Sequence, residues 1–448
     1  MRVLLAFCFI ASFTGCSTSW TPSSAPAQFG PNAGIRAAFE PANAATVVFR
    51  FRIRDGGYPI GRLVAVGTTL YGTASSGGTG CKTYGGCGTI FSVSSNGAVE
   101  ILYKFKGGND GALPLSGLLS LHGKLYGTTF SGGDALCATN YGQGCGTVFV
   151  FDPASRQEHV LHAFLAGKDG AGPLSVPVFV KGTLYGTTQS GGACPKNTSG
   201  TGCGTIFGID TTGKSYRMLY AFKDGAAGAQ PNASLTNVGG ILFGAAFTGG
   251  TGACAKHTGC GTIFRFDPGT GRLKTLYSFK GGTDGWNPMA GLVSAGGLLY
   301  GMTFSGGMGC ASFSYYDGCG TVFSFDPANN TEKVLHAFTQ GLPAGRLIFA
   351  NGKLYGVTET GGTGTCGFPG AGTGCGTVFS IVPNGGSLQT IHNFPGHGVG
   401  GKNGAYPQGG LTMAGGRLYG VAQYGGNKGC YTNFNNLFGC GVIFSLSP

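Results

Sequence analysis

The sequence of 448 residues carries one unit seven times, and this repetition constrains the fold more than any other feature. A Leu-aromatic-Gly tripeptide recurs along the chain, at Leu70-Tyr71-Gly72, Leu125-Tyr126-Gly127, Leu184-Tyr185-Gly186, Leu242-Phe243-Gly244, Leu299-Tyr300-Gly301, Leu354-Tyr355-Gly356 and Leu418-Tyr419-Gly420. A Gly-Cys-Gly segment follows each tripeptide, with its cysteine at Cys87, Cys145, Cys203, Cys260, Cys319, Cys375 and Cys440. The spacing of these cysteines defines units of about 58 residues, and such self-similarity indicates a repeat architecture.

Each unit contains four short apolar segments separated by turn sequences. In the fifth unit these segments are residues 290–295, 298–304, 320–325 and 333–338. A Gly-Gly pair, a loop with two cysteines and an Asp-Pro turn separate them in that order. Short strands at such regular spacing indicate antiparallel meanders. Seven meanders in tandem predict an all-β fold, a seven-bladed β-propeller of four-stranded antiparallel blades.

Composition excludes the main alternatives to a β-protein. Glycine supplies 91 of the 448 residues, aromatic residues 12% and charged residues only 10%. Glycine inside a helix costs about 1 kcal/mol, and disordered chains combine few aromatics with a high charge density. The net charge of +12 favours acidic partners. Because the basic residues are scattered and form no recognisable motif, we expect no binding of nucleic acid.

The two ends of the repeat region predict closure of the ring. The last unit stops at its third strand, Val442–Leu446, and lacks a fourth. An apolar segment before the first unit, Val47–Phe51, has the pattern of a fourth strand. We therefore expect this N-terminal strand to complete the last blade, which removes the free sheet edges of an open array. The propeller domain is predicted to span residues 45–448.

The N-terminus has the form of an export signal. Met1-Arg2 is basic and Val3–Gly15 is mostly apolar, which is too short to cross a bilayer and typical of a signal peptide. The sequence around Cys16 resembles a bacterial lipobox, so residues 1–15 are predicted to be the signal peptide and Cys16 the lipidated residue. A plain secretory signal cleaved nearby is the alternative. Residues 16–44 are expected to form a flexible tether.

The cysteines form a pattern that favours disulfides. Each unit has a second cysteine shortly before its Gly-Cys-Gly, which gives the pairs Cys81/Cys87, Cys137/Cys145, Cys194/Cys203, Cys254/Cys260, Cys310/Cys319, Cys366/Cys375 and Cys430/Cys440. These pairs use all of the 16 cysteines except Cys8 in the signal and Cys16. A zinc site needs four ligands, whereas each pair stands alone in its blade. We expect seven disulfides, no metal and no cofactor, in an exported protein.

The seven Leu-aromatic-Gly and Gly-Cys-Gly marks make the chain from about residue 46 onward similar to the GloVer tandem-repeat family. The Gly-Gly after each second strand is also kelch-like. The resemblance implies an exported protein at the cell surface, and it implies no activity. Relatives differ in how they are anchored. Because this chain ends at Pro448, just past a strand, the resemblance implies Cys16 as the anchor, and we expect the bacterial cell envelope as the location.

Propeller connectivity places the cysteine loops on the same face as the connections between blades. Those connections carry an Asp-Gly-x-x-Pro pattern at Asp55, Asp110 and Asp284, and Asp169 stands four residues before a proline. We expect the aspartates to cap turns. Long variable loops are where binding residues concentrate. The candidate ligand-binding aromatics lie in the loops of blades five, six, seven and one: Phe313, Tyr315, Tyr316, Phe368, Tyr431, Phe434, Phe438 and Tyr84. The alternative is that these rings cover their own loops.

Two arginines break the repeat. Arg62 and Arg346 stand at the start of the innermost strand, where other blades have the small residues Gly117, Ser234, Gly291 and Gly410. Inner strands line the central channel, so both are candidate ligands for an anionic group. A solvated or stacked arginine is the alternative.

Three histidines align with aromatic residues of other blades, which indicates packing rather than catalysis. His162, His336 and His392 each precede a phenylalanine by two residues, as do Phe49, Tyr103, Tyr220 and Tyr277 in the other blades. The chain contains no Gly-x-Ser-x-Gly, phosphate-loop or His-Glu-x-x-His motif. Glu332 and Glu359 are acids without an evident partner.

These observations predict a surface-anchored, monomeric, non-catalytic β-propeller. We expect it to bind a glycan or protein ligand, with an anionic ligand favoured, on its disulfide-loop face, and to contact the membrane through the N-terminal lipid alone. The alternatives are an enzyme acting on polysaccharide (a hydrolase or lyase) and a purely structural component of the envelope.

Overall fold

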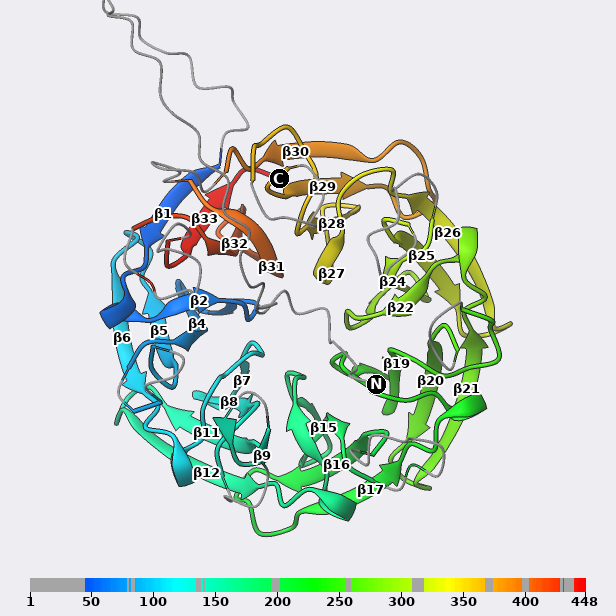
Figure 1. Cartoon of the computed structure of the whole chain (residues 1–448), viewed down its shortest axis with the longest axis horizontal. Coiled ribbons are helices and arrows are strands. Elements are labelled where there is room, and N and C mark those ends of the chain that lie inside the picture. The colour runs from blue at the N-terminus through cyan, green and yellow to red at the C-terminus, as the bar shows by residue number, and fades with distance from the viewer. Residues whose placement is uncertain are drawn as a thin grey trace, which may run out of the picture.

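The computed structural model describes residues 45–448 apart from 79, 82–84, 134–137, 140–141, 193, 195–201, 255–258, 308–317, 367–373, 397–402, 428–429 and 431–438. Seven antiparallel sheets stand around a central axis like the blades of a propeller (Figure 1). The predicted fold class is thereby confirmed. The signal peptide and tether predicted for residues 1–44, with Cys16, lie outside the described residues. No helix among the described residues is long and apolar enough to cross a membrane.

The first four blades follow one another along the chain. Blade one contains β2 (Gly57–Pro59), β3 (Val64–Val66), β4 (Thr69–Ser76), β5 (Thr89–Val93) and β6 (Val99–Lys104). Blade two contains β7 (Leu119–Leu121), β8 (Lys124–Thr129), β11 (Thr147–Asp152) and β12 (Gln157–Ala163), with a small hairpin of β9 (Ala138–Thr139) and β10 (Gly142–Gln143). Blade three contains β13 (Ala171–Pro173), β14 (Val178–Val180), β15 (Thr183–Ser190), β16 (Thr205–Asp210) and β17 (Arg217–Ala221). Blade four contains β18 (Thr236–Val238), β19 (Ile241–Ala246), β20 (Thr262–Asp267) and β21 (Arg272–Ser278).

The remaining blades complete the ring. Blade five contains β22 (Trp286–Pro288), β23 (Val293–Ala295), β24 (Leu298–Ser305), β25 (Thr321–Asp326) and β26 (Thr331–Ala337). Blade six contains β27 (Pro343–Ala350), β28 (Lys353–Thr358), β29 (Thr377–Ile381) and β30 (Gln389–Asn393). Blade seven contains β31 (Ala405–Ala414), β32 (Arg417–Tyr424), β33 (Val442–Leu446) and β1 (Thr46–Arg50). Single-turn 3-10 helices precede five blades: η1 (Ile53–Asp55), η3 (Gly108–Asp110), η4 (Gly167–Asp169), η5 (Gly225–Ala227) and η6 (Gly282–Asp284).

The outer strand of blade seven comes from the N-terminal end of the described chain. β1 pairs antiparallel with β33, with Thr46 opposite Ser445 and Arg50 opposite Val442. In Figure 1 the blue β1 lies beside the red β33. Both ends of the propeller therefore share one sheet.

The inner strand differs in detail from the expected continuous segment. In blade five, β22 and β23 both pair with β24, but the residues between them leave the ladder. Proline has no N–H to donate to a ladder, and Pro288 ends β22. Its predecessor Asn287 has a φ of 57°, a left-handed conformation that turns the chain out of the strand. The predicted strand 290–295 was therefore too long at its N-terminal end, and the Asp-Gly-x-x-Pro segment supplies a first short piece of the inner strand.

The glycine of each Leu-aromatic-Gly tripeptide makes room for a phenylalanine of the neighbouring strand. A Cβ on Gly127 would lie 2.6 Å from Cζ of Phe149 and 2.9 Å from Cδ2 of Leu118. The six equivalent glycines would put a Cβ 2.4–2.5 Å from the corresponding phenylalanine. Real Cβ atoms do not approach ring carbons so closely, so any side chain here would displace the core. This explains why the tripeptide recurs in every blade.

Aromatic rings join each blade to the next. The phenylalanine after a fourth strand packs edge-on against the phenylalanine of the next blade's third strand, as Phe105 does against Phe149 with ring centroids 5.3 Å apart. The other six contacts are Phe51–Phe91, Phe164–Phe207, Phe222–Phe264, Phe279–Phe323, Phe338–Phe379 and Phe394–Phe444, with centroids 5.0–5.4 Å apart. Edge-to-face pairs at this distance are favourable beyond the area they bury.

Candidate functional site

The blades enclose a cavity of about 590 Å³ on the propeller axis. Its wall includes residues from all seven blades, in or beside their inner strands. In blade one it is lined by residues 60–65, which follow β2 and enter β3. A cavity of this size is within the range of small-molecule sites, about 300–1,000 Å³. The axis is thus a candidate binding site.

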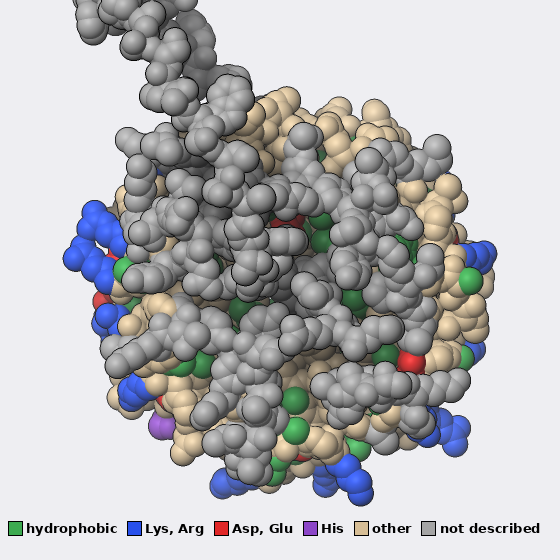
Figure 2. All heavy atoms as spheres, viewed as in Figure 1, with side chains coloured by type: hydrophobic (Ala, Val, Ile, Leu, Met, Phe, Trp, Pro, Cys, Tyr) green, Lys and Arg blue, Asp and Glu red, His purple; other side chains and the backbone are tan. Residues whose placement is uncertain are grey.

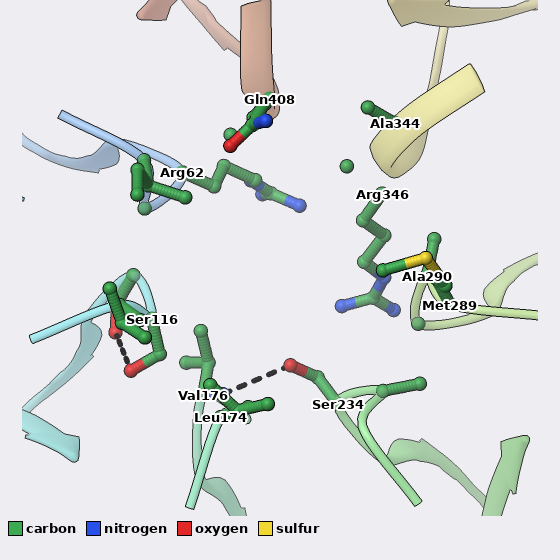
Figure 3. Close-up of a pocket in the computed structure, with 18 of the residues that line it drawn as sticks. Arg62, Ser116, Leu174, Val176, Ser234, Met289, Ala290, Ala344, Arg346 and Gln408 are labelled. Atoms are coloured by element: carbon green, nitrogen blue, oxygen red, sulfur yellow. Dashed lines mark hydrogen bonds between the residues drawn. The ribbon is translucent and has the colours of Figure 1, made fainter. Parts of the chain in front are cut away.

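Both predicted arginines reach into this cavity. Figure 3 shows the side chains of Arg62 and Arg346 pointing into the space between the inner strands. Arg346 donates from Nε to the carbonyl oxygen of Leu292 at 2.9 Å and from Nη2 to Oγ1 of Thr236 at 3.1 Å. Arg62 donates from Nε to Oγ1 of Thr412 at 3.3 Å. These acceptors belong to blades four, five and seven, so contacts between blades fix the orientation of both guanidinium groups.

The two positive charges lack a carboxylate partner among the described residues. Burial, together with the nearby charge of Arg62, lowers the pKa of Arg346 to about 10. Burial also lowers the pKa of Arg62. Both groups remain charged at neutral pH, and their acceptors are neutral. A partly buried pair of like charges is costly unless an anion compensates it.

Glu359 is the acid that lines the same cavity. Its side chain is 6% exposed, and burial raises the pKa of Glu359 to about 7, while a hydrogen bond with Gln408 opposes the shift. Other blades have serine, phenylalanine or glutamine at this position: Ser75, Phe130, Gln189, Phe247, Phe304 and Gln423. Sequence reasoning singled out Glu359 as an acid without a partner but did not place it at the channel, although this break in the repeat was visible.

Part of the cavity wall is apolar. Blades one, two, three and five contribute Ile60, Leu115, Leu174, Val176, Met289, Met302 and Phe304. Its polar side chains include Arg62, Arg346, Glu359 and Gln408, together with serine and asparagine side chains of blades two and four. The cavity therefore combines apolar residues with two cationic groups, a combination that only the closed ring creates.

The structure contains the disulfides that lie within its described residues. Five predicted pairs are bonded, with Cα atoms 5.0–5.3 Å apart: Cys81–Cys87, Cys194–Cys203, Cys254–Cys260, Cys366–Cys375 and Cys430–Cys440. Cys145 and Cys319 are disulfide-bonded as well. Their predicted partners, Cys137 and Cys310, lie outside the described residues.

The candidate aromatics of the loops are not placed by the structure. Tyr84, Phe313, Tyr315, Tyr316, Phe368, Tyr431, Phe434 and Phe438 all lie outside the described residues. Of the ten predicted ligand-binding residues, the structure brings Arg62 and Arg346 together and leaves the aromatic platform an expectation.

The connections between blades lie directly against the disulfides. A Cβ on Gly107 would lie 2.9 Å from Sγ of both Cys81 and Cys87, and one on Gly281 would lie 2.8 Å from Sγ of Cys254. The disulfides and these connections therefore share one face of the propeller, which we call the disulfide-loop face. Among the described residues it consists of the five disulfides and the helices η1 and η3–η6.

Exposed basic side chains follow the rim of the disulfide-loop face. Five consecutive blade junctions, from seven/one to four/five, each carry at least one exposed cation: Arg52, Arg54, Lys106, Lys168, Lys223 and Lys280. We call this set the basic arc. Figure 2 shows Lys and Arg side chains around the edge of the molecule. Sequence reasoning missed the arc because the six residues are scattered along the chain and only the circular arrangement of blades aligns them.

The aromatic position of the fourth strand packs as predicted. In all seven blades this ring lies edge-on to the phenylalanine two residues later, as in His336–Phe338 and His392–Phe394, with centroids 4.8–5.3 Å apart. Burial lowers the pKa of both His336 and His392, which favours their neutral forms. Packing therefore accounts for these histidines.

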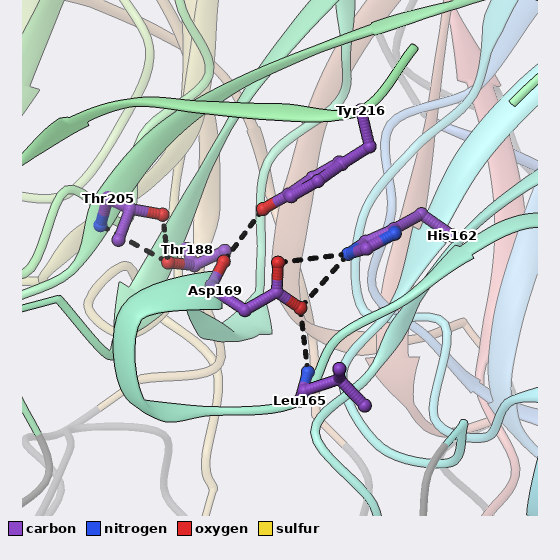
Figure 4. Close-up of polar contacts among 6 residues, drawn as sticks. All are labelled: His162, Leu165, Asp169, Thr188, Thr205 and Tyr216. Carbon is purple, nitrogen blue, oxygen red and sulfur yellow. Dashed lines mark hydrogen bonds and ion pairs between the residues drawn. The ribbon is translucent and has the colours of Figure 1, made fainter. Parts of the chain in front are cut away.

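His162 also contacts the aspartate of the next connection (Figure 4). Its Nε2 lies 3.0 Å from Oδ2 of Asp169, which also accepts the backbone N–H of Leu165 at 2.8 Å. Tyr216 stacks on the imidazole with centroids 3.5 Å apart and donates to the carbonyl oxygen of Asp169 at 2.7 Å. The aspartate caps its turn, as expected, and also holds the histidine.

Two other junctions hold a carboxyl pair at this position. Tyr103 donates to Oδ1 of Asp110 at 2.5 Å and lies 3.5 Å from Oε2 of Glu158. Burial and the nearby charge of Asp110 raise the pKa of Glu158 to about 8. Tyr277, Asp284 and Glu332 repeat this arrangement, and the pKa of Glu332 is likewise raised to about 8. No group of three or more His, Cys, Asp or Glu side chains suited to a metal occurs in the described part of the chain.

Comparisons with known proteins identify a matching family model and find distant matches among solved structures. A family model described as the Gloeobacter/Verrucomicrobia repeat matches residues 136–369, just over half of the chain. No curated protein matches the chain.

Three solved structures match the chain at low sequence identity. A chain of the nidogen/laminin complex is 18% identical with a TM-score of 0.39, and the match covers 63% of this chain and 81% of that one. The acylaminoacyl peptidase of Pyrococcus horikoshii is 9% identical with a TM-score of 0.44, covering 82% of this chain and 50% of that one. An oligogalacturonate lyase in complex with manganese is 10% identical with a TM-score of 0.47, covering 88% and 89%.

Proposed function

The chain belongs to the Gloeobacter/Verrucomicrobia repeat family, and from this premise we propose that it is an exported, non-catalytic β-propeller that binds an acidic glycan on its disulfide-loop face. The observation that carries the proposal is the basic arc. It presents exposed cations at five successive blade junctions on the face that also carries the disulfides. A regular row of charges on a rigid ring is complementary to a polymer with repeated anionic groups.

The arrangement of charges at the rim supports an anionic partner. Two acidic side chains of these junctions are engaged by the backbone: Asp110 and Asp284 accept the N–H of Lys106 and Lys280 at 2.6 and 2.7 Å. At the first junction Asp55 pairs with Arg54 at 3.6 Å, which leaves Arg52 as the cation without that pairing. Glu158 has a pKa raised to about 8 and is mostly neutral at pH 7. The lysine side chains are exposed beside these acids. The field that a ligand meets at the rim is therefore positive.

Export and anchoring complete the proposal. The five described disulfides are typical of an exported protein. We propose that the lipid on Cys16 attaches the propeller to the bacterial envelope, and that Tyr315, Tyr316 and Phe434 of the variable loops stack on sugar rings. Aromatic rings supply large contact area at low entropic cost.

The test compares two faces of the same protein. Lys106, Lys223 and Lys280 occupy one equivalent position of the arc, directly after the fourth-strand phenylalanine, and all are exposed. Changing the three to Glu should weaken binding of a carboxylated polysaccharide such as hyaluronate at least tenfold, measured by calorimetry. The matched control changes Lys124, Lys181 and Lys214 to Glu. These lysines are exposed at the turns of the opposite face, and we expect them to leave binding unchanged.

Other outcomes decide against the proposal. Equal losses in both triple variants would mean a non-specific effect of net charge. Binding of neutral dextran as tightly as hyaluronate would exclude a preference for acidic glycans. Depolymerisation of the glycan by the wild-type chain would instead support an enzyme acting on polysaccharide. A glycan array with Tyr315, Tyr316 and Phe434 changed to Ala tests the loop aromatics, and binding that is indifferent to these changes contradicts their role.

A further inference from the structure

We propose that the axial cavity is a second binding site, for a small amphipathic carboxylate whose carboxylate group lies between Arg62 and Arg346 and whose apolar body lies against the apolar residues of the cavity wall. The inference goes beyond the glycan surface at the rim, because it rests on different residues and on an enclosed space of about 590 Å³.

The first argument is the cost of the two arginines. Both half-buried side chains reach into one cavity, and the nearness of Arg62 contributes to the lowered pKa of Arg346. The fold does not require an arginine at either position, because blades two, four, five and seven have Gly117, Ser234, Gly291 and Gly410 there. An anion that accepts from both guanidinium groups removes the repulsion between them.

The second argument is preorganisation. Nε of Arg346 is held by the carbonyl oxygen of Leu292, and Nη2 donates to Leu292 and to Thr236. Thr412, which accepts from Nε of Arg62, is fixed by its own hydrogen bond of 2.5 Å to the carbonyl oxygen of Leu63. Hydrogen bonds through Nε therefore hold both guanidinium groups in place. Binding a ligand costs little further conformational entropy in these side chains.

The third argument is the apolar wall. Leu174 and Val176 of blade three and Met289, Met302 and Phe304 of blade five line the cavity. A bare inorganic anion leaves these apolar residues in contact with water. A hydrocarbon body covers them, and each Å² of apolar surface removed from water stabilises the complex by about 25 cal/mol. The two arginines and the apolar residues of the wall thus match the two ends of an amphipathic carboxylate.

Glu359 should make ligand binding in the cavity depend on pH. Among the described residues that line the cavity, the ionisable side chains are Arg62, Arg346 and Glu359, and the neutral Gln408 hydrogen-bonds to Glu359. Below a pH of about 7 the carboxyl is neutral and both arginines are available to the ligand. Above it, Glu359 adds a negative charge to the cavity wall, so affinity for an anion should fall as pH rises.

The experiment titrates the chain with octanoate by calorimetry, beside octanamide (the same body without charge) and sulfate (charge without a body). We expect octanoate to bind at least tenfold more tightly than either. Arg62→Gln and Arg346→Gln should each weaken octanoate binding at least tenfold. Arg417→Gln is the matched control, since Arg417 lies outside the cavity wall and donates to a neutral hydroxyl of Ser445 at 3.2 Å. If Arg346→Gln fails to fold, Arg62→Gln and the charge-conserving Arg346→Lys decide.

The pH dependence provides an independent readout. Octanoate affinity should fall at least threefold between pH values of about 6 and about 8, and Glu359→Gln should abolish that fall without weakening binding at the lower pH. Equal affinity for octanamide, or undiminished binding by folded Arg62→Gln and Arg346→Gln chains, overturns the proposal. Measuring both ligands on both sets of variants separates the two sites. The lysine variants of the rim should still bind octanoate, and the arginine variants of the cavity should still bind hyaluronate.

Discussion

The ring of Phe51 packs edge-on against the ring of Phe91, with centroids 5.1 Å apart and an interplanar angle of 66°. Phe51 follows β1 of blade seven, and Phe91 lies in β5 of blade one. Both side chains are fully buried. The contact between the last and first blades is therefore the same aromatic pair that joins blades elsewhere in the ring, as Phe222 and Phe264 join blades three and four at 5.3 Å.

Removing the ring of Phe51 should weaken the contact that joins blade seven to blade one. We expect Phe51→Ala to lower the free energy of unfolding by about 3–5 kcal/mol, the usual cost of truncating a buried phenylalanine. Denaturant titration measures the loss. Phe349→Ala is the control, because Phe349 is 43% exposed, and it should change stability by less than about 0.5 kcal/mol. A loss for Phe51→Ala no larger than for the control would show that the closing contact contributes little.

The tripeptide glycines should not tolerate a methyl group. In Gly127→Ala the new Cβ would lie 2.6 Å from Phe149, and such overpacking costs about 1–3 kcal/mol. Gly269→Ala is the control, since its Cβ would approach only the exposed carboxylate of Asp267, at 3.3 Å. We expect thermal unfolding to separate the two variants clearly, and equal melting temperatures would contradict the packing explanation of the repeat.

Stability should fall as pH rises from weakly acidic to weakly basic values. The pKa values of Glu158 and Glu332 are raised to about 8 in the folded chain and are about 4.3 in an unfolded one. Between these values the folded state binds more protons, so the free energy of unfolding decreases with pH. The stabilisation is complete below about pH 4.3 and is lost as pH rises through about 8.

Neutral replacements should flatten this dependence. Glu158→Gln and Glu332→Gln together should remove most of the loss between neutral and weakly basic pH, measured by denaturant titration at several pH values. The remaining slope is expected from Glu359, whose pKa is raised to about 7. Glu100→Gln is a control at an exposed acid. A double variant with the slope of the wild type would argue against buried carboxyl groups at the two junctions.

Reduction should reveal the full set of disulfides. Seven bonds predict an intact mass about 14 Da higher after reduction, from two hydrogens per bond. In the chain-entropy model each short loop contributes about 2–3 kcal/mol, so reduction should also lower the melting temperature strongly. Mass spectrometry measures the first effect and thermal unfolding the second. A substantial free-thiol count in the unreduced propeller would contradict the pairing.

The periodic residues made most of the fold predictable. Gly127 and its equivalents are required in every blade because each faces the same phenylalanine, so the requirement is repeated in the sequence. The aromatic position of His162, His336 and His392 was assigned to packing for the same reason. The length of the inner strand was not predictable, because the left-handed residue before Pro288 is defined by its backbone angle rather than its side chain.

The non-periodic residues needed the tertiary structure. Arg62 and Arg346 are 284 positions apart in sequence, and the sequence suggested only that both line a channel. That Glu359 and the apolar residues Leu174, Met289 and Phe304 share their cavity follows from closing the ring.

The sequence alone thus determined the number of blades, most of the strands within them and the partners of the five described disulfides, because these depend on contacts that every unit makes with itself or its neighbour. The tertiary structure decided which unrepeated residues meet. The basic arc and the cavity that holds Arg62, Arg346 and Glu359 join residues from distant blades. Such encounters are fixed by the circular arrangement of blades around one axis, which no local pattern encodes.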